Sequence, residues 1–141
     1  MNLQIDKFKA MISKVVEDYF ELKDSPYLSE AEKLIIDNYH YKKSSESDLR
    51  DALYNLSIFL EKHYHQKVII LIDEYDVPLQ SAYHHGYYDE MVDFIRSVFS
   101  SALKTNDALE RGVLTGCLRI SKESIFTGLN NFTVRTITDV E

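Results

Sequence analysis

The sequence predicts an α/β protein with a helical N-terminal half and a short parallel sheet in its C-terminal half. Three observations carry this prediction. Apolar residues recur every three or four positions through the first 65 residues, which is the period of helices with one buried face. Residues 68–72 then form an unbroken branched aliphatic run, and residues 113–115 give a second, shorter candidate strand. Unbroken runs are typical of strands buried on both faces of a parallel sheet.

The N-terminal part is expected to contain three helices. The first ends before Pro26 and carries the apolar stripe Leu3, Phe8, Ile12, Val15, Tyr19 and Leu22. Ser29 and Glu32 have the spacing of a capping box, so a second helix is expected to begin there and to run to about residue 39. A polar run over residues 42–48 separates it from a third helix with the stripe Leu49, Leu53, Leu56 and Leu60.

The strand at residues 68–72 is followed at once by acidic side chains, namely Asp73, Glu74 and Asp76. A buried strand that ends in acids is typical of the Walker B motif of ATPases, and open α/β sheets bind ligands at the carboxyl ends of their strands. In that interpretation Asp73 holds Mg²⁺ through its hydration shell and Glu74 polarises the attacking water. Metal-dependent phosphodiester cleavage by the three acids is a weaker hypothesis, because adjacent acids point apart on a strand.

A Walker B acid works together with a phosphate cradle of the form G-x-x-x-x-G-K-[ST], whose backbone N–H groups and lysine bind the phosphates. The four glycines of the chain are Gly86, Gly112, Gly116 and Gly128, and none is followed by Lys-Ser or Lys-Thr. The sequence therefore carries half of a nucleotide site.

A helix from about residue 87 to residue 104 is expected between the two strands. Its buried side is formed by Met91, Phe94, Ile95, Val98, Phe99, Ala102 and Leu103. The pairs at residues 63 and 65 and at residues 84 and 85 are histidines without a third ligand nearby in sequence, so structural or surface roles are favoured over metal binding. Three tyrosines at residues 83, 87 and 88 could form a surface patch that binds a partner, but tyrosines at the start of a helix are more often half-buried packing residues.

The second strand ends in small and polar residues, as a strand that senses nucleotide requires. Thr115 is placed to orient the lytic water, and Arg119 and Lys122 follow it, available to neutralise phosphate charge. The same pattern is explained equally well by an ordinary turn from a strand to a helix with solvated basic residues. These residues alone do not favour either the nucleotide-sensing strand or the ordinary turn.

Two segments together make a resemblance specific. Residues 68–79 (VIILIDEYDVPL) and residues 112–132 (GVLTGCLRISKESIFTGLNNF) resemble the AAA-ATPase-like domain of the P-loop NTPase superfamily, which commonly precedes a PD-(D/E)xK nuclease-like domain. The resemblance covers the whole chain weakly and corresponds to the middle and later part of that domain. It implies a partial P-loop-like three-layer fold in which a Walker B strand lies beside a sensor strand.

The resemblance also implies site residues. Asp73 and Glu74 match the Walker B acids, Asp76 matches the third acid and a metal-binding position, and Thr115, Arg119 and Lys122 match the sensor strand and the region after it. The implied cofactors are Mg²⁺ and ATP. The Walker A lysine and Ser/Thr have no counterpart, so this chain alone is expected not to hydrolyse ATP. The sequence leaves open whether nucleotide binds without them, so the cofactors are either Mg²⁺ and ATP or none.

Composition narrows the partners and the location. A net charge of −7 and a pI near 5.2 argue against nucleic-acid binding, which needs clustered Lys and Arg. Cys117 is the single cysteine, and no apolar stretch approaches the roughly 20 residues needed to span a bilayer, so a cytoplasmic protein is expected. The 141 residues suit one domain, with a helical part over residues 1–65 and an α/β part over residues 66–141.

Two function classes stay open. The chain is either a fragment of an ATPase domain with a Mg-ATP half-site, or a catalytically inactive module that self-associates or binds a complementing protein segment. A P-loop sheet order would put the missing Walker A strand between the sensor strand and a last strand at residues 132–137. We therefore expect an unpaired apolar strand edge at residues 113–115, which proteins normally cover or pair.

Overall fold

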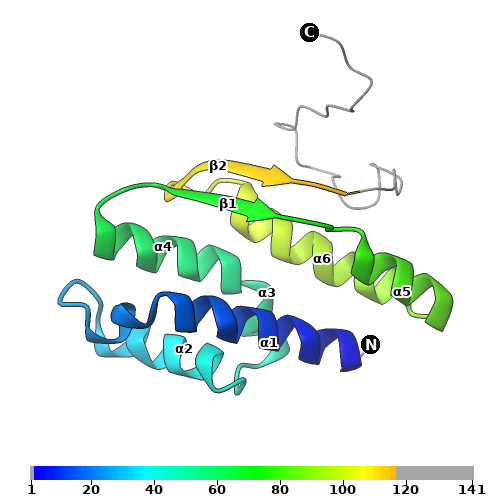
Figure 1. Ribbon diagram of the computed structural model, residues 1–141, viewed down its shortest axis with the longest axis horizontal. Coiled ribbons are helices and arrows are strands. Elements are labelled where there is room, and N and C mark those ends of the chain that lie inside the picture. The colour runs from blue at the N-terminus through cyan, green and yellow to red at the C-terminus, as the bar shows by residue number, and fades with distance from the viewer. Residues whose placement is uncertain (1, 117–141) are drawn as a thin grey trace, which may run out of the picture.

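The structure is a computed structural model, and it describes residues 2–116 (Figure 1). The N-terminal elements are the helices α1 (Asn2–Asp18), α2 (Glu30–His40), α3 (Glu46–Arg50) and α4 (Ala52–Tyr64), with a short 3-10 helix, η1 (Phe20–Asp24), after α1. The C-terminal elements are β1 (Val68–Ile72), α5 (Val77–His85), α6 (Tyr88–Leu103) and β2 (Leu109–Leu114). The last strand predicted at residues 132–137 lies outside the described residues.

The two strands form a parallel sheet, as the sequence predicts. β1 and β2 pair with Val68 opposite Leu109 and Ile72 opposite Leu114, and an irregularity follows Val68. The connection between them runs through α5 and α6, which is the crossover that parallel neighbours require. β2 begins four residues earlier than the predicted strand at residues 113–115, so Thr115 lies just beyond its carboxyl end.

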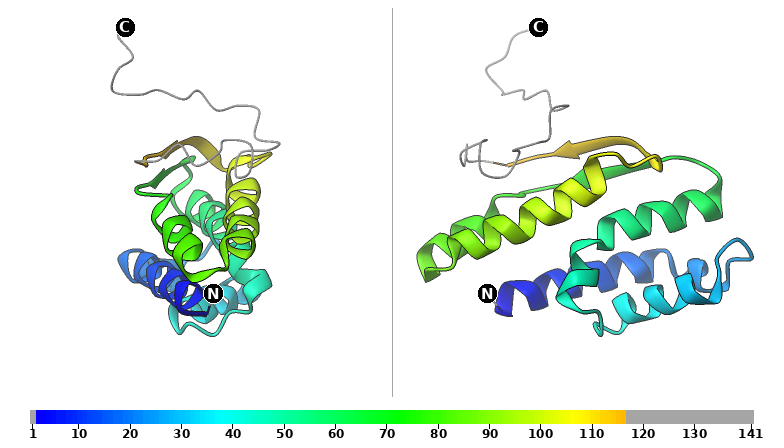
Figure 2. Two further views of the ribbon diagram at one scale, coloured as in Figure 1. Left: turned by 90° about the vertical axis from the view of Figure 1, so that its right-hand side faces the viewer. Right: turned by 180° about the vertical axis from the view of Figure 1, so that it is seen from behind.

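Helices cover one face of this sheet. α4 contacts β1 and α6 contacts β2, while α1 and α2 form a second helical layer farther from the strands (Figures 1 and 2). The α/β class, the short parallel sheet and the helical N-terminal half are therefore confirmed. Within residues 2–116, all the helices lie on the same side of the strands.

The other face of the sheet is open to solvent in the described part of the chain. Ile69 and Leu71 on β1 are 54% and 74% exposed, and Val113 on β2 is 41% exposed, whereas Ile70 between them is buried. The expectation that β1 is buried on both faces is therefore wrong within residues 2–116. Both faces of β1 carry apolar side chains, which is typical of a strand covered on both sides, but helices cover only one face in the described part of the chain.

The N-terminal helices follow the sequence signals where caps are present. Ser29 accepts a hydrogen bond from the Glu32 backbone N–H, and the Glu32 carboxylate accepts one from the Ser29 backbone N–H, so the capping box is confirmed. The predicted first helix is too long, because α1 ends at Asp18 and η1 carries Leu22 into the core. Leu3 and Tyr19 of its predicted stripe are exposed.

The predicted third helix is in fact two helices. α3 ends at Arg50, and Asp51 adopts a non-helical backbone conformation before α4 begins. Leu49 and Leu56 are nevertheless buried as expected, while Leu53 and Leu60 are partly buried at the edge of the core. The turn keeps the apolar stripe facing the same core and changes only the direction of the backbone.

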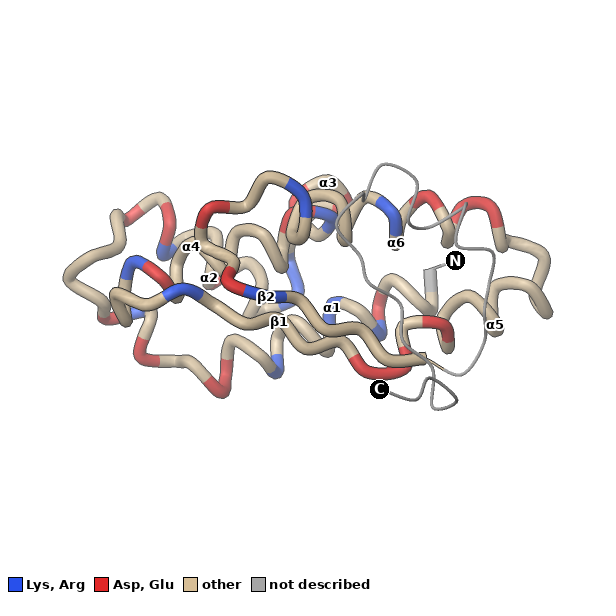
Figure 3. Tube along the Cα trace, turned by 90° about the horizontal axis from the view of Figure 1, so that it is seen from above, with Lys and Arg blue, Asp and Glu red and all other residues tan. Residues whose placement is uncertain are grey.

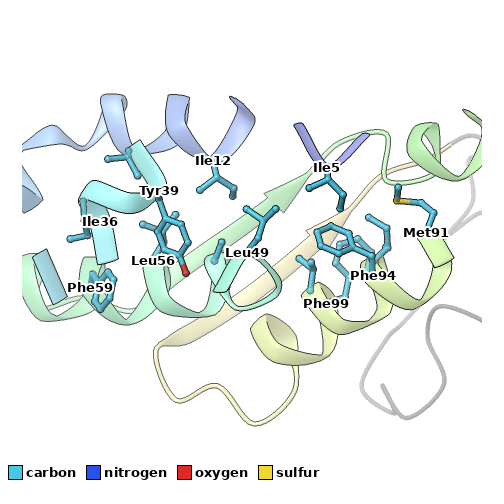
Figure 4. Close-up of a cluster of buried hydrophobic side chains, with 14 of the residues drawn as sticks. Ile5, Ile12, Ile36, Tyr39, Leu49, Leu56, Phe59, Met91, Phe94 and Phe99 are labelled. Carbon is cyan, nitrogen blue, oxygen red and sulfur yellow. The ribbon is translucent and has the colours of Figure 1, made fainter. Parts of the chain in front are cut away.

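One apolar core joins both layers of helices, and Figure 4 shows part of it. α6 contributes all of its predicted apolar face, of which Leu103 alone is only partly buried. The ring of Phe94 on α6 meets the ring of Phe8 on α1 edge to face, with centroids 5.4 Å apart. The layer of helices that supports the sheet is thereby tied to the N-terminal helix.

Candidate functional site

The predicted site residues that the structure describes gather where β1 and β2 end. Asp73 and Glu74 follow β1 directly and both side chains are exposed. Figure 3 views the molecule from above, with the two strands toward the viewer, and shows acidic residues just after β1. Glu74 has a positive φ of 53°, a left-handed conformation that costs a residue with a side chain roughly 1–2 kcal/mol. The chain therefore turns sharply at the acids instead of continuing the strand.

Thr115 holds this turn through four hydrogen bonds. Its backbone N–H donates to the carbonyl oxygen of Ile72 (2.8 Å), and its own carbonyl oxygen accepts from the backbone N–H of Tyr75 (3.0 Å). Its hydroxyl oxygen accepts from the Glu74 backbone N–H (3.3 Å), and the hydroxyl donates to the Asp73 carboxylate. Thr115 therefore lies next to both acidic residues, and its hydroxyl fixes the Asp73 carboxylate where the two strands end.

Asp76 occupies a different environment from the other two acids. It is buried at the start of α5, where its carboxylate accepts a hydrogen bond from the Gln80 side chain (3.1 Å). Burial of the neighbouring Tyr75 ring raises the pKa of its phenol, and the negative charge of Asp76 raises that pKa further. Asp76 therefore lies beneath the turn, while Asp73 lies at the surface.

Gly116 fits tightly against this turn and was not singled out by the sequence. A Cβ atom on Gly116 would lie 2.5 Å from a ring carbon of Tyr75 and 2.9 Å from a carboxylate oxygen of Asp76. Tyr75, Gln80 and Gly116 thus complete the support of the acidic turn. Gly116 contacts Tyr75 and Asp76, which are about 40 positions away in the sequence, and Gln80 binds a carboxylate that only the folded structure shows to be buried. No local sequence pattern therefore identifies these residues.

Substitution of Gly116 by alanine is expected to disturb this turn. The added methyl group would push against Tyr75 and the buried Asp76, and overpacking of this kind typically costs about 1–3 kcal/mol. Amide resonances of residues 73–76 should shift in a ¹H–¹⁵N spectrum of Gly116→Ala. Gly86→Ala is the matched control, because its Cβ has open space and only its positive φ of 81° opposes the change. Unchanged resonances at residues 73–76 would contradict the tight fit.

The acids and histidines do not form a metal cluster in the described structure. Within residues 2–116, no group of three or more His, Cys, Asp or Glu side chains is arranged to hold a metal ion. The three acids of the turn are therefore not gathered as the phosphodiester-cleavage hypothesis requires. His63 contacts Ser25 through its Nδ1 atom (2.8 Å), and His84 and His85 lie exposed in the last turn of α5.

The remaining predicted residues fall into two groups. Arg119 and Lys122 lie outside the described residues. Of the tyrosines, Tyr83 is strongly exposed and its ring meets the Tyr88 ring edge to face, with centroids 6.1 Å apart, while Tyr87 and Tyr88 are half-buried against the core.

A shallow hollow lies at the other end of the sheet, where β1 begins. It contains none of the predicted site residues and is lined by Glu61, Lys62, His65, Gln66 and Lys67.

No helix in the described part of the chain is both long enough and apolar enough to cross a bilayer.

Comparison with known proteins gives a family and one relative. The model of a family described as predicted AAA-ATPase matches residues 3–126. A protein of Azotobacter chroococcum mcd 1, described as an uncharacterized protein in the vnfD 5' region, is 38% identical over 68 residues. The matched residues are 47% of this chain and 13% of that protein, so the chain matches only a small part of the relative's length. No solved structure matches the chain significantly.

Proposed function

Since the chain belongs to the AAA-ATPase-like family, whose model matches residues 3–126, we propose that the carboxyl edge of its sheet is the magnesium-facing half of an ATP site. The observation that supports this proposal best is the hydrogen-bond network that joins Thr115 to Asp73 and to the Glu74 backbone. It fixes a carboxylate and a hydroxyl from two neighbouring strands at the edge where open α/β sheets bind ligands.

The side chains at this edge suit magnesium. Mg²⁺ prefers oxygen ligands and keeps several waters, so it is commonly held by one or two carboxylates together with phosphate oxygens. Asp73 is exposed and its carboxylate is oriented by Thr115, which fits such a role. When bound, Mg²⁺ would neutralise charge on the nucleotide phosphates.

Glu74 and Thr115 have separate roles in this proposal. The Glu74 backbone is held by Thr115 in a left-handed turn, which leaves its exposed carboxylate free to accept a proton from water at the sheet edge. Thr115 positions both acids. Arg119 and Lys122 follow this threonine by a few residues and would supply positive charge near the phosphates.

The phosphate cradle would come from residues outside this sequence. The sequence contains no G-x-x-x-x-G-K-[ST] segment, so the proposed half-site on its own would bind nucleotide weakly and would not hydrolyse it. The proposed location is the cytoplasm, where ATP, Mg²⁺ and a reduced cysteine coexist.

A fluorescent ATP analogue titrated in the presence of Mg²⁺ tests the proposal. Weak, saturable binding is expected, and Asp73→Asn should reduce the affinity at least about tenfold, which corresponds to about 1.4 kcal/mol. Thr115→Val, which removes the hydroxyl, should weaken binding, whereas Thr115→Ser should retain it. The matched control is Asp107→Asn, because Asp107 is an exposed aspartate at the opposite edge of the sheet.

Two outcomes of this titration would overturn the nucleotide proposal for the chain by itself. One is equal affinity of the wild type and Asp73→Asn. The other is absence of saturation at millimolar nucleotide.

A catalytically inactive interaction module is the second candidate function. The exposed apolar face formed by Ile69, Leu71 and Val113 favours it, because parallel sheets are normally covered on both faces. In this alternative the helices support a binding surface, and the acidic turn has no chemical role.

A further inference from the structure

We infer that the open face of the sheet is a docking surface for a second copy of this chain. The open face is defined here as the outward positions of β1 and β2, namely Ile69, Leu71, Arg111 and Val113, with Asp73 and Thr115 just beyond them. This inference builds on the interaction alternative and does not depend on nucleotide binding.

The register of the two strands arranges the open face in three rows. Ile69 lies opposite Arg111 in the first row, and Leu71 lies opposite Val113 in the second. Side chains alternate between the faces of a strand, so Asp73 and Thr115 fall in the third row, and their hydrogen bond confirms that they share a side. The face therefore has a cation in one outer row, an anion in the other, and apolar residues between them.

This order is complementary to itself. A two-fold axis that lies along the middle row, perpendicular to the strands, brings the apolar row of one copy onto that of the other. The first row of each copy then faces the third row of its neighbour. Arg111 lies on β2, whereas Asp73 of the second copy follows β1, so this pair is diagonal. It spans the distance of about 10 Å between facing sheets and of about 4.8 Å between neighbouring strands, which arginine and aspartate side chains together can bridge. Two Arg111–Asp73 ion pairs, related by the axis, would flank the apolar row.

The charged groups are available for this contact. Arg111 is exposed and forms no ion pair with another residue in the described part of the chain. Asp73 is exposed and accepts a hydrogen bond from Thr115, which leaves a carboxylate oxygen for an arginine. The middle row supplies an apolar contact, since Leu71 is the most exposed large apolar side chain among the described residues.

The small size of the face predicts a weak dimer. Two strands of five and six residues offer much less than the roughly 800 Å² that each partner buries in a stable interface. A dissociation constant on the order of 100 μM is therefore expected, and added salt should raise it because the ion pairs lie at the rim. Binding of Mg²⁺ to Asp73 would compete with the arginine of the second copy.

Sedimentation velocity without Mg²⁺ or nucleotide, from about 10 μM to about 1 mM protein, tests the inference. The wild-type mass should rise from monomer to dimer over this range. Arg111→Asp alone and Asp73→Arg alone should stay monomeric, because each variant places like charges against each other. An equimolar mixture of the two variants should form a dimer again, since each charge then meets its opposite in the mixed pair.

Controls separate this contact from misfolding and from unspecific association. Lys104→Asp reverses an exposed charge at the end of α6, away from the open face, and should dimerise as the wild type does. Circular dichroism of each variant should match the wild type, because both substituted side chains are exposed. A wild type that is monomeric at about 1 mM overturns the inference. So does an Arg111→Asp variant that dimerises normally, or a mixture of folded variants that stays monomeric.

The two proposals fail separately. The dimer is measured without ligand, and nucleotide binding is measured at protein concentrations at which the chain is a monomer. Loss of the dimer with retained ATP binding rejects the docking surface only, and the reverse result rejects the nucleotide half-site only.

Discussion

Phe94→Ala is expected to lower the free energy of unfolding by about 3–5 kcal/mol, the usual cost of deleting a large buried aromatic ring. Phe94 is almost fully buried at the centre of α6. Its ring packs edge to face on Phe8 and beneath the Arg50 guanidinium, whose central carbon is 5.3 Å from the ring centroid. The substitution therefore removes an apolar contact that links α1 and α3 to α6, the helix beneath β2, while the polar contacts of Arg50 with Asp93 and Ser97 remain.

Urea unfolding followed by circular dichroism measures this effect. Such a loss is a large part of the roughly 5–15 kcal/mol that stabilises an ordinary domain. The matched control is Phe20→Ala, because the Phe20 side chain is 66% exposed and its removal should change stability by less than about 0.5 kcal/mol. Equal midpoints for the two variants would show that Phe94 is not a core residue.

Tyr39→Ala is expected to cost a similar amount, about 3–5 kcal/mol, and Tyr39→Phe about 1–3 kcal/mol. The Tyr39 ring is fully buried between α2 and α4. Its hydroxyl donates to the Asp48 carbonyl oxygen (2.8 Å) and accepts from the Asn55 side-chain amide (3.0 Å). Phenylalanine keeps the ring and leaves both of these groups without their partner, so the two variants separate packing from hydrogen bonding.

The same tyrosine predicts how stability depends on alkaline pH. Burial raises the pKa of the Tyr39 phenol from its ordinary value near 10 to about 12, and the charges of Asp48 and Asp51 add to this effect. Because the pKa is higher in the folded state, the contribution of Tyr39 is complete below pH 10. It is lost as pH rises from about 10 to about 12. In Tyr39→Phe this part of the alkaline loss should vanish, whereas Tyr83→Phe, at an exposed tyrosine, should retain it.

Sequence patterns predicted the elements best where a local chemical signal marks them. The capping box at Ser29 placed the start of α2 correctly, and the 3.6-residue period of α6 identified its buried face. The end of α1 and the break at Asp51 were missed, because the apolar stripe continues through both turns. The spacing of apolar residues shows which side of a helix faces the core. It does not reveal a turn after which the apolar side chains still face the same core.

The candidate site was predictable only in part, for a related reason. The run at residues 68–72 followed by acids identifies the strand and its carboxyl end, and the second strand suggested Thr115 as a neighbour of the acids. The left-handed turn at Glu74 and the close fit of Gly116 depend on pairing between β1 and β2, which no local pattern encodes. The openness of the outer face was missed as well, because a strand with two apolar faces does not specify what covers the second one.

The four hydrogen bonds of Thr115 make the acidic turn dependent on contacts between residues 40 to 43 positions apart. The helical core does not need those contacts, because its packing involves α1 to α6. Separation of β2 from β1 would therefore dismantle the turn while the helices stay folded, as a local opening with a lower free energy than global unfolding. Any ligand that engages the assembled turn would hold the two strands together, so its affinity includes the free energy of closing the sheet.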